Sequence, residues 1–324
     1  MLFSYKENDY NNYMEIFIIV LSSLVALALI FYIIIASVGA YNFVKQAAWP
    51  NFDTREKRKA RNKKEGISKG TEKWAREEFT LTMKDGYVIH GDMTINDPKK
   101  VVMLMHGHSS TREGVLKYAK VFHEFGYSVV MYDHRGHGDN EKTYVSMGYR
   151  EAKDAAEMLS FLRKKFGNDA KLGVFGVSMG GATALIMTQY TQDMDFIVCD
   201  CPYDSLEEML KPACKAHKAW WPLPMLFTKI RMKIKYGFSF KDVRTRDFAR
   251  AIRVPVLLIM GDKDTKVAVN SQKLIQKNLH CYNDSLIVPN AGHGKSVEVD
   301  PDGYKNKVND FLNHVYSLQN ERNN

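Results

Sequence analysis

Residues 171–187 read KLGVFGVSMGGATALIM and contain the pattern G-x-S-x-G centred on Ser178. The apolar residues before this pattern have the length of a strand, and the residues after it are typical of a helix. A strand, a sharp turn and a helix are the context in which such a serine is exposed at the end of a sheet. Gly176, Gly180 and Gly181 supply the small residues needed where the strand and the helix pass close together. The stretch therefore predicts a nucleophilic serine on a strand-to-helix turn.

Other apolar runs of strand length lie on both sides of this turn. They cover residues 101–105, 128–132, 196–199, 254–260 and 285–288, and helical patterns separate several of them. A hairpin is predicted before these runs, with strands at 78–83 and 87–90 around the turn signal Asp85-Gly86. A last helix is expected at about 302–316. Strands that alternate with helices predict an α/β fold with a mostly parallel, doubly wound sheet.

The connection between the strands at 196–199 and 254–260 is much longer than a usual strand-to-helix connection. Its residues 204–253 hold twelve basic and five acidic residues, and residues 220–227 read WWPLPMLF. We expect a helical cap inserted over the C-terminal edge of the sheet. Trp220, Trp221 and the basic residues suit a cap that faces a membrane surface. A cap with its aromatic side chains turned inward over a small soluble substrate is the alternative, and both remain open.

Residues 16–38 contain no charged residue and follow a short N-terminal segment, residues 1–15. At about 1.5 Å per residue, this run is long enough to cross a hydrocarbon core of roughly 30 Å. We therefore predict a transmembrane helix. A cleaved signal peptide is the alternative, but the run is long for one and no basic region precedes it. A basic juxtamembrane linker is expected at 39–75, followed by the catalytic domain at 76–324.

The charges on the two sides of the apolar run differ. Residues 1–15 hold one lysine and three acidic residues, whereas residues 45–64 hold eight basic and two acidic residues. Basic residues mark the cytoplasmic end of a span, so the large domain is expected on the cytoplasmic side of the cell membrane. The formal net charge of +9 then suits an anionic membrane surface. No nucleic-acid-binding module or phosphate loop is present in the sequence, so we expect no nucleic-acid partner.

Ser178 needs a base to remove its proton, and a carboxylate must orient that base. In enzymes with this type of turn the chain order is serine, then an acid, then histidine. Asp264 and His293 follow Ser178 in this order, and each lies directly after a predicted strand. Asp262 is an alternative acid, and two others, Asp200 and Asp204, follow the preceding strand.

The negative oxygen formed during acyl transfer needs two hydrogen-bond donors, which are commonly backbone N–H groups. Met179 directly follows the serine, and His108 lies in the loop after the strand at 101–105, with Ser109 as a second choice. Four histidines gather in two loops: His106, His108, His134 and His137. No complete set of ligands with zinc-type spacing accompanies them, so we expect no metal and no cofactor.

These residues resemble the α/β-hydrolase superfamily, especially its bacterial serine esterases and serine-aminopeptidase-like members. The matching motifs are His106-Gly107, Asp133-His134-Arg135-Gly136-His137-Gly138, Gly176-Val177-Ser178-Met179-Gly180-Gly181, Gly261-Asp262-Lys263-Asp264 and Gly292-His293-Gly294. The resemblance implies Ser178 as nucleophile, Asp264 as acid and His293 as base. It also implies hydrolysis of small or lipid-like acyl esters through an acyl-enzyme. An amide or peptide hydrolase on the same triad and an inactive membrane-bound interaction protein are the alternatives.

Overall fold

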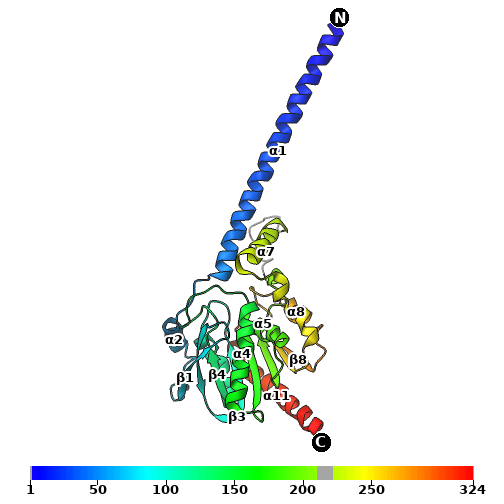
Figure 1. Cartoon of the computed structure of the whole chain (residues 1–324). Coiled ribbons are helices and arrows are strands. Elements are labelled where there is room, and N and C mark those ends of the chain that lie inside the picture. Colours follow the sequence, from blue (N-terminus) through cyan, green and yellow to red (C-terminus); the bar gives the residue numbers. More distant parts are fainter. Residues whose placement is uncertain (1, 210–221, 324) are drawn as a thin grey trace.

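The computed structural model describes residues 2–209 and 222–323 and shows a long N-terminal helix that projects from a sheet covered by helices (Figure 1). The strands of the sheet are β1 (Arg76–Thr82), β2 (Val88–Thr94), β3 (Asp97–Met105), β4 (Tyr127–Tyr132), β5 (Lys171–Val177), β6 (Phe196–Asp200), β7 (Val256–Gly261) and β8 (Asn283–Val288). The α-helices are α1 (Leu2–Ala48), α2 (Arg55–Lys64), α3 (Leu116–Glu124), α4 (Tyr149–Phe166), α5 (Met179–Ile186), α7 (Pro222–Tyr236), α8 (Thr245–Phe248), α9 (Asn270–Gln276), α10 (Ser296–Val299) and α11 (Pro301–Asn323). Short 3-10 helices are η1 (Arg112–Val115), η2 (Met187–Gln189), η3 (Phe240–Val243) and η4 (Ala249–Ala251).

The sheet has the strand order β1-β2-β4-β3-β5-β6-β7-β8. β2 pairs antiparallel with both β1 and β4, and all pairs from β4 to β8 are parallel. The predicted hairpin forms the antiparallel edge, and the later apolar runs form the parallel part. The predicted α/β fold with a mostly parallel sheet is therefore confirmed.

The strands in the middle of the sheet are apolar along their whole length because helices cover both faces. In β3, Val101, Met103 and Met105 point into one core, which α4 and α5 also line. Val102 and Leu104 point into the other core, to which α3 and α11 contribute. Because these neighbouring strands pair in the same direction, their C-terminal ends form one edge of the sheet.

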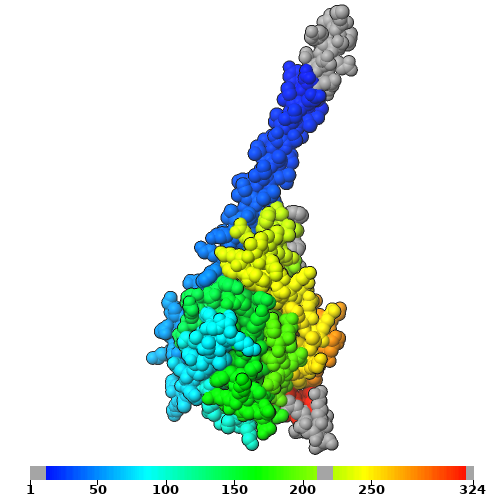
Figure 2. All heavy atoms as spheres, in the orientation of Figure 1, coloured from blue at the N-terminus to red at the C-terminus, as the bar shows by residue number. Residues whose placement is uncertain are grey.

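Helix α1 continues ten residues past the predicted end of the span at Val38. It is the one helix in the described part of the chain that is long and apolar enough to cross a membrane, with a candidate span at Asn12–Ala48. Its large apolar side chains are exposed, as at Phe31. Figure 2 shows the helix rising as a rod from the rounded body of the protein. Near its C-terminal end α1 packs beside α7 and buries Ala36, Ala40 and Val44, which lie four residues apart on one face (Figure 1).

The basic juxtamembrane linker predicted at 39–75 is largely helical instead, since α1 extends to Ala48 and α2 covers Arg55–Lys64. Helix α2 begins after Thr54, whose hydroxyl accepts a hydrogen bond from the N–H of Lys57. Arg55 is buried and lies 3.0 Å from a carboxylate oxygen of Asp92 and 3.1 Å from one of Glu113. These two buried carboxylates require a cation, and Arg55 helps to neutralise them. The prediction was wrong because the pairing joins residues far apart in sequence, which local composition does not reveal.

The connection from β6 to β7 is helical, as expected. Its described part contains α7, η3, α8 and η4, and α7 lies beside the C-terminal end of α1 (Figure 1). Trp220 and Trp221, which suggested a membrane-facing cap, lie outside the described residues.

Candidate active site

Ser178 lies on the turn between β5 and α5, with φ 56° and ψ −116°. This backbone conformation is uncommon for a residue with a side chain, so close packing must maintain it. A Cβ atom added to Gly176 would lie 2.2 Å from the carbonyl oxygen of Gly180, and one added to Gly180 would lie 2.2 Å from that of Met105. Glycine is therefore required at both positions, and the turn presents the serine hydroxyl at the C-terminal edge of the sheet.

The structure brings three of the predicted residues into one chain of hydrogen bonds. Ser178 Oγ lies 2.9 Å from His293 Nε2, and His293 Nδ1 lies 2.7 Å from Asp264 Oδ2. The other oxygen of the Asp264 carboxylate accepts hydrogen bonds from the N–H groups of Lys266 and Val267. The carboxylate is thus fixed and buried, and it orients the imidazole with Nδ1–H toward itself. His293 Nε2 is then free to accept the proton of the Ser178 hydroxyl.

The alternative acids have other partners. Asp262 accepts a hydrogen bond from the N–H of Asn290, in the loop that leads to His293. Asp204 accepts hydrogen bonds from side chains at the start of α8 and α9. Asp200 is buried beneath the serine turn, and its burial raises the pKa of the carboxyl to about 6. Among these aspartates, the carboxylate bonded to His293 is that of Asp264.

The loop after β3 passes directly over the serine. A Cβ atom added to Gly107 would lie 3.4 Å from Ser178 Cβ. The N–H of Ser109, the second choice as an oxyanion donor, is already bonded to His137 Nε2 at 3.2 Å. Within the described residues, the N–H groups of His108 and Met179 donate no hydrogen bond to another protein atom. Both backbone donors are consequently without a protein acceptor in the described residues.

The histidines of the two neighbouring loops hold those loops in place. His106 Nε2 accepts a hydrogen bond from the N–H of His134, and His137 Nε2 accepts the one from Ser109. Burial lowers the pKa of His106 and of His134 to about 3, so both imidazoles are neutral near pH 7. His108 differs, because its Nε2 donates to the carbonyl oxygen of Ala47 at 2.8 Å.

One group of side chains in the described ranges, 2–209 and 222–323, has the spacing of a metal site. It consists of Cys201, Asp264 and His293, whose possible ligand atoms all lie within 4.8 Å of one another. Burial raises the pKa of the Cys201 thiol, which keeps it protonated and makes it a poor ligand. The other two side chains already bond to each other in the serine–histidine–aspartate arrangement. The group is better explained by that arrangement than by a metal.

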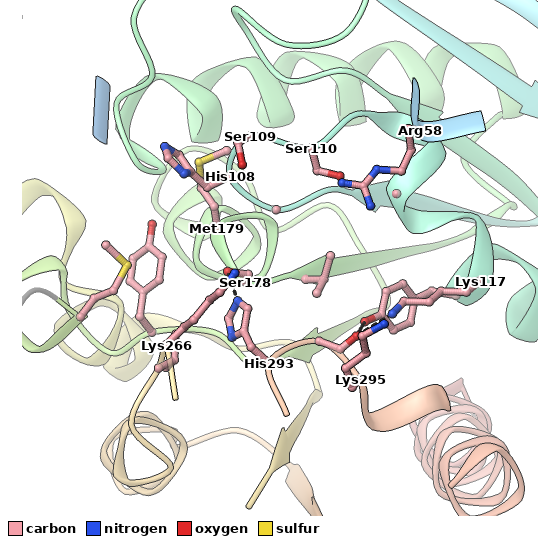
Figure 3. A pocket seen from close by; sticks show the side chains of 18 of the residues that line it. Arg58, His108, Ser109, Ser110, Lys117, Ser178, Met179, Lys266, His293 and Lys295 are labelled. Atoms are coloured by element: carbon pink, nitrogen blue, oxygen red, sulfur yellow. Dashed lines mark hydrogen bonds between the residues drawn. The ribbon is translucent and has the colours of Figure 1, made fainter. Parts of the chain in front are cut away.

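A cavity of about 450 Å³, here called the active-site cavity, opens above Ser178 and His293 (Figure 3). Several of its lining residues could not be predicted from the sequence. They come from α1 (Phe43, Gln46 and Ala47), from α2 (Arg58 and Asn62) and from α3 (Lys117 and Tyr118). The capping threonine before α2 was a signal for that helix, but no local pattern indicated that α1 and α2 reach the site.

The chain is similar to several known proteins. The family model described as serine aminopeptidase, S33, matches residues 96–247. The chain is 27% identical over 242 residues to the uncharacterized protein YqkD of Bacillus subtilis, covering 73% of this chain and 79% of YqkD. It is 26% identical over 183 residues to the lysophosphatidylserine lipase ABHD12 of Danio rerio, covering 52% of this chain and 44% of that protein.

The fold is also found among solved structures. The esterase Pf2001 of Pyrococcus furiosus superposes with a TM-score of 0.61 at 22% identity, covering 77% of this chain and 94% of that one. At this identity the similarity shows the fold alone. Together with the family model matched at residues 96–247 and the serine turn at the edge of the sheet, it shows that the chain has the α/β-hydrolase fold and supports a hydrolase activity.

Proposed function

We propose that this protein is a membrane-anchored serine hydrolase that cleaves carboxylic esters. Ser178 is the nucleophile, His293 is the general base, and Asp264 orients the histidine and stabilises its protonated form. The observation that carries this proposal is the hydrogen-bond chain from Ser178 Oγ through His293 to Asp264. Its components come from the ends of three different strands, which is where open α/β sheets place their sites.

The reaction follows from these positions. Ser178 Oγ attacks the ester carbonyl carbon while His293 Nε2 takes the hydroxyl proton. The N–H groups of His108 and Met179 stabilise the negative oxygen of the tetrahedral intermediate. When the bond to the alcohol breaks, His293 gives the proton to the leaving oxygen and an acyl-Ser178 ester remains. Water attacks this ester with His293 again as base, which releases the carboxylic acid and restores the serine.

Esters are preferred over amides in this proposal for two reasons. Two of the similar proteins are described as an esterase and a lipase. An aminopeptidase must also bind the positive amino group of its substrate, which needs a free carboxylate near the serine. Of the two acidic residues that line the active-site cavity, Glu298 is already paired with Lys117 at 2.5 Å and Lys295 at 2.6 Å, which leaves Glu65 as the one acidic side chain of the lining that could bind an amino group. Peptide hydrolysis is the second candidate, because the matching family model is described as serine aminopeptidase.

The anchor in this proposal is α1. Its exposed apolar residues suit a hydrocarbon environment, and the excess of basic residues after the span favours a cytoplasmic location for the large domain. A signal sequence can also form an apolar helix near the N-terminus. However, the last turns of α1 pack against α7 and line the active-site cavity, which favours a helix that stays with the domain.

The test uses the full chain in detergent micelles. A fluorophosphonate probe should label the wild-type protein, and a panel should compare esters of graded chain length with aminoacyl amides. The proposal expects labelling at Ser178 and faster turnover of esters than of matched amides. Faster turnover of the amides would favour the aminopeptidase. The absence of both labelling and turnover would identify an inactive interaction protein.

A further inference from the structure

Helix α1 forms part of the wall of the active-site cavity. Phe43, Gln46 and Ala47, from its last turns, line the same cavity as Ser178 and His293. A helix that acted only as a tether would have no reason to reach the nucleophile. The chain thus has one continuous helix that begins in an apolar, exposed segment and ends beside the reacting serine.

Hydrogen bonds fix this end of α1 to the loops around the site. The last carbonyl groups of a helix lack partners within the helix and need them from elsewhere. His108 Nε2 donates to the carbonyl oxygen of Ala47 at 2.8 Å, and the N–H of Val145 donates to that of Ala48 at 2.8 Å. His108 also belongs to the loop that passes over Ser178, so the loop and the end of α1 are held together.

The position of the cavity along α1 sets its depth relative to a membrane. Phe43 and Ala47 follow Val38, the end of the uncharged run, by five and nine residues. At a rise of about 1.5 Å per residue, they lie roughly 8 to 14 Å beyond it along the helix axis. The headgroup layer on each side of a bilayer is roughly 5 to 8 Å thick. If Val38 marks the edge of the hydrocarbon core, the cavity therefore begins at the outer limit of the headgroups.

Helix α7 reaches the same depth and has an exposed apolar stripe. Leu226, Ile230 and Ile234 are exposed and lie four residues apart, and Ile234 is 80% exposed. Arg231 donates a hydrogen bond to the hydroxyl of Ser37, which places the middle of α7 beside the end of the uncharged run. A helix with exposed apolar residues among lysines is typical of a membrane interface. A location of α7 at a membrane interface therefore accounts for its exposed apolar side chains, which would be costly in water.

The active-site cavity has a charged end. Figure 3 shows Arg58, Lys117 and Lys295 together on one side of Ser178 and His293. Lys117 and Lys295 share the carboxylate of Glu298 and Arg58 contacts Asp53, so these three cations exceed the carboxylates they contact by one charge. The cavity lining has four basic and two acidic side chains, and it also has several apolar ones: Phe43, Ala47, Met147, Val177, Met209 and Val267. A volume of about 450 Å³ is toward the lower end of the range for ligand cavities, which suits one acyl chain.

We propose that α1 is a component of the active site, and that the enzyme takes single-chain acyl esters with anionic headgroups directly from the membrane that anchors it. The acyl chain lies against Phe43, and the headgroup lies toward Lys295. This inference rests on the proposed function, because it assumes that Ser178 cleaves the ester. It adds the class of substrate and a role for the anchor that a soluble esterase would not need.

The first test measures acyl-chain recognition with the full chain in phosphatidylcholine vesicles. The substrates are 1-oleoyl lysophosphatidylglycerol and the soluble ester p-nitrophenyl butyrate. Phe43→Ala should lower the ratio of kcat/KM for the oleoyl ester to that for the butyrate about tenfold, because a buried aromatic contact with the long chain is lost. Phe31→Ala, on the same helix but outside the cavity, should leave both rates unchanged.

The second test measures headgroup recognition in the same vesicles. Lys295→Gln should reduce the preference for 1-oleoyl lysophosphatidylglycerol over 1-oleoyl lysophosphatidylcholine about threefold, since a partly exposed charge contributes modestly. Lys164→Gln, an exposed residue of α4 outside the cavity, is the matched control. A preference that does not change in Lys295→Gln would overturn the headgroup assignment.

The outcomes separate this inference from the proposed function. If the wild-type protein cleaves the butyrate but not the oleoyl ester, or if Phe43→Ala leaves their ratio unchanged, the role of α1 is wrong and the serine hydrolase remains. If neither ester is cleaved and the fluorophosphonate does not label Ser178, the proposed function fails and the inference fails with it.

Discussion

His293 Nδ1 lies 2.7 Å from the carboxylate of Asp264, whereas the carboxylate of Asp262, two residues earlier, bonds to the backbone of Asn290. We predict that Asp264→Asn lowers kcat by about 10⁴-fold, because an amide no longer fixes the required tautomer or stabilises the imidazolium. Asp262→Asn is the matched control and should cost less than about tenfold. Steady-state kinetics with one ester checks both. A larger loss in Asp262→Asn would show that the acid has been assigned wrongly.

Ser178→Ala should remove both fluorophosphonate labelling and turnover, since no other group can form the acyl-enzyme. His293→Ala should lose nearly as much activity, because the members of such a triad act as a unit. Active-site titration and circular dichroism of the same samples measure the activity and the fold. Turnover at the wild-type rate by a folded Ser178→Ala protein would contradict the mechanism.

Arg55 should matter for stability rather than for chemistry. It is 9% exposed and bonds to Asp92 and Glu113, which are buried. Arg55→Met leaves these carboxylates with fewer cations, and we expect a loss of about 3–5 kcal/mol in the free energy of unfolding. Lys57→Met, an exposed residue of the same helix, should change this free energy by less than about 0.5 kcal/mol. Denaturant unfolding of the full chain in micelles measures both, and equal effects would contradict the prediction.

The buried histidines make stability depend on pH. The pKa of His106 and of His134 is lowered to about 3 in the folded protein, and an unfolded histidine has a pKa of about 6.5. Between these values the unfolded chain binds protons that the folded chain does not. Each of these histidines therefore reduces stability by about 1.4 kcal/mol per pH unit as the pH falls below 6.5, and has no such effect above it.

Ring resonances of His106 and His134 in an NMR titration test this directly. They should not shift between pH 8 and pH 5 in the folded protein. In urea the same resonances should titrate near pH 6.5, which is the control. Titration of either ring above pH 5 in the folded protein would show that burial does not keep it neutral.

The exposed apolar residues of α7, Leu226, Ile230 and Ile234, predict which part of the domain contacts the membrane. A spin label at Leu226→Cys, in a background with Cys214→Ser and Cys281→Ser, should be more accessible to oxygen than to a polar nickel chelate in vesicles. The reason is that oxygen concentrates in the apolar layer, toward which the Leu226 end of α7 points, whereas Ile234 lies beside Tyr41 and Lys45, beyond the uncharged run. The same label at Lys164→Cys, near the end of α4 that is remote from the serine edge, should show the opposite preference. If the labels at the two positions showed the same relative accessibility to oxygen and to the nickel chelate, the predicted contact of α7 with the membrane would be wrong.

Much of the fold and the arrangement of the proposed catalytic residues were predictable because both leave local signals. The run Val101–Met105 is a buried strand by composition, and the order of Ser178, Asp264 and His293 along the chain is that of this type of site. The docking of α2 was not predictable, since the partners of Arg55 are separated from it by tens of residues. The contribution of Phe43 to the cavity was hidden for a similar reason, because its neighbours in sequence indicate only the end of an apolar helix.

The continuous helix from the exposed apolar segment to Ala47 also determines which measure of substrate concentration sets the rate of hydrolysis. If α1 is the anchor that we propose, an enzyme with Phe43 in its active-site cavity stays at one height above the bilayer. Encounters with its substrate then occur by diffusion in two dimensions. The rate should follow the mole fraction of substrate in the lipid, so that diluting the same bilayer with more buffer leaves it unchanged, whereas adding inert lipid slows it.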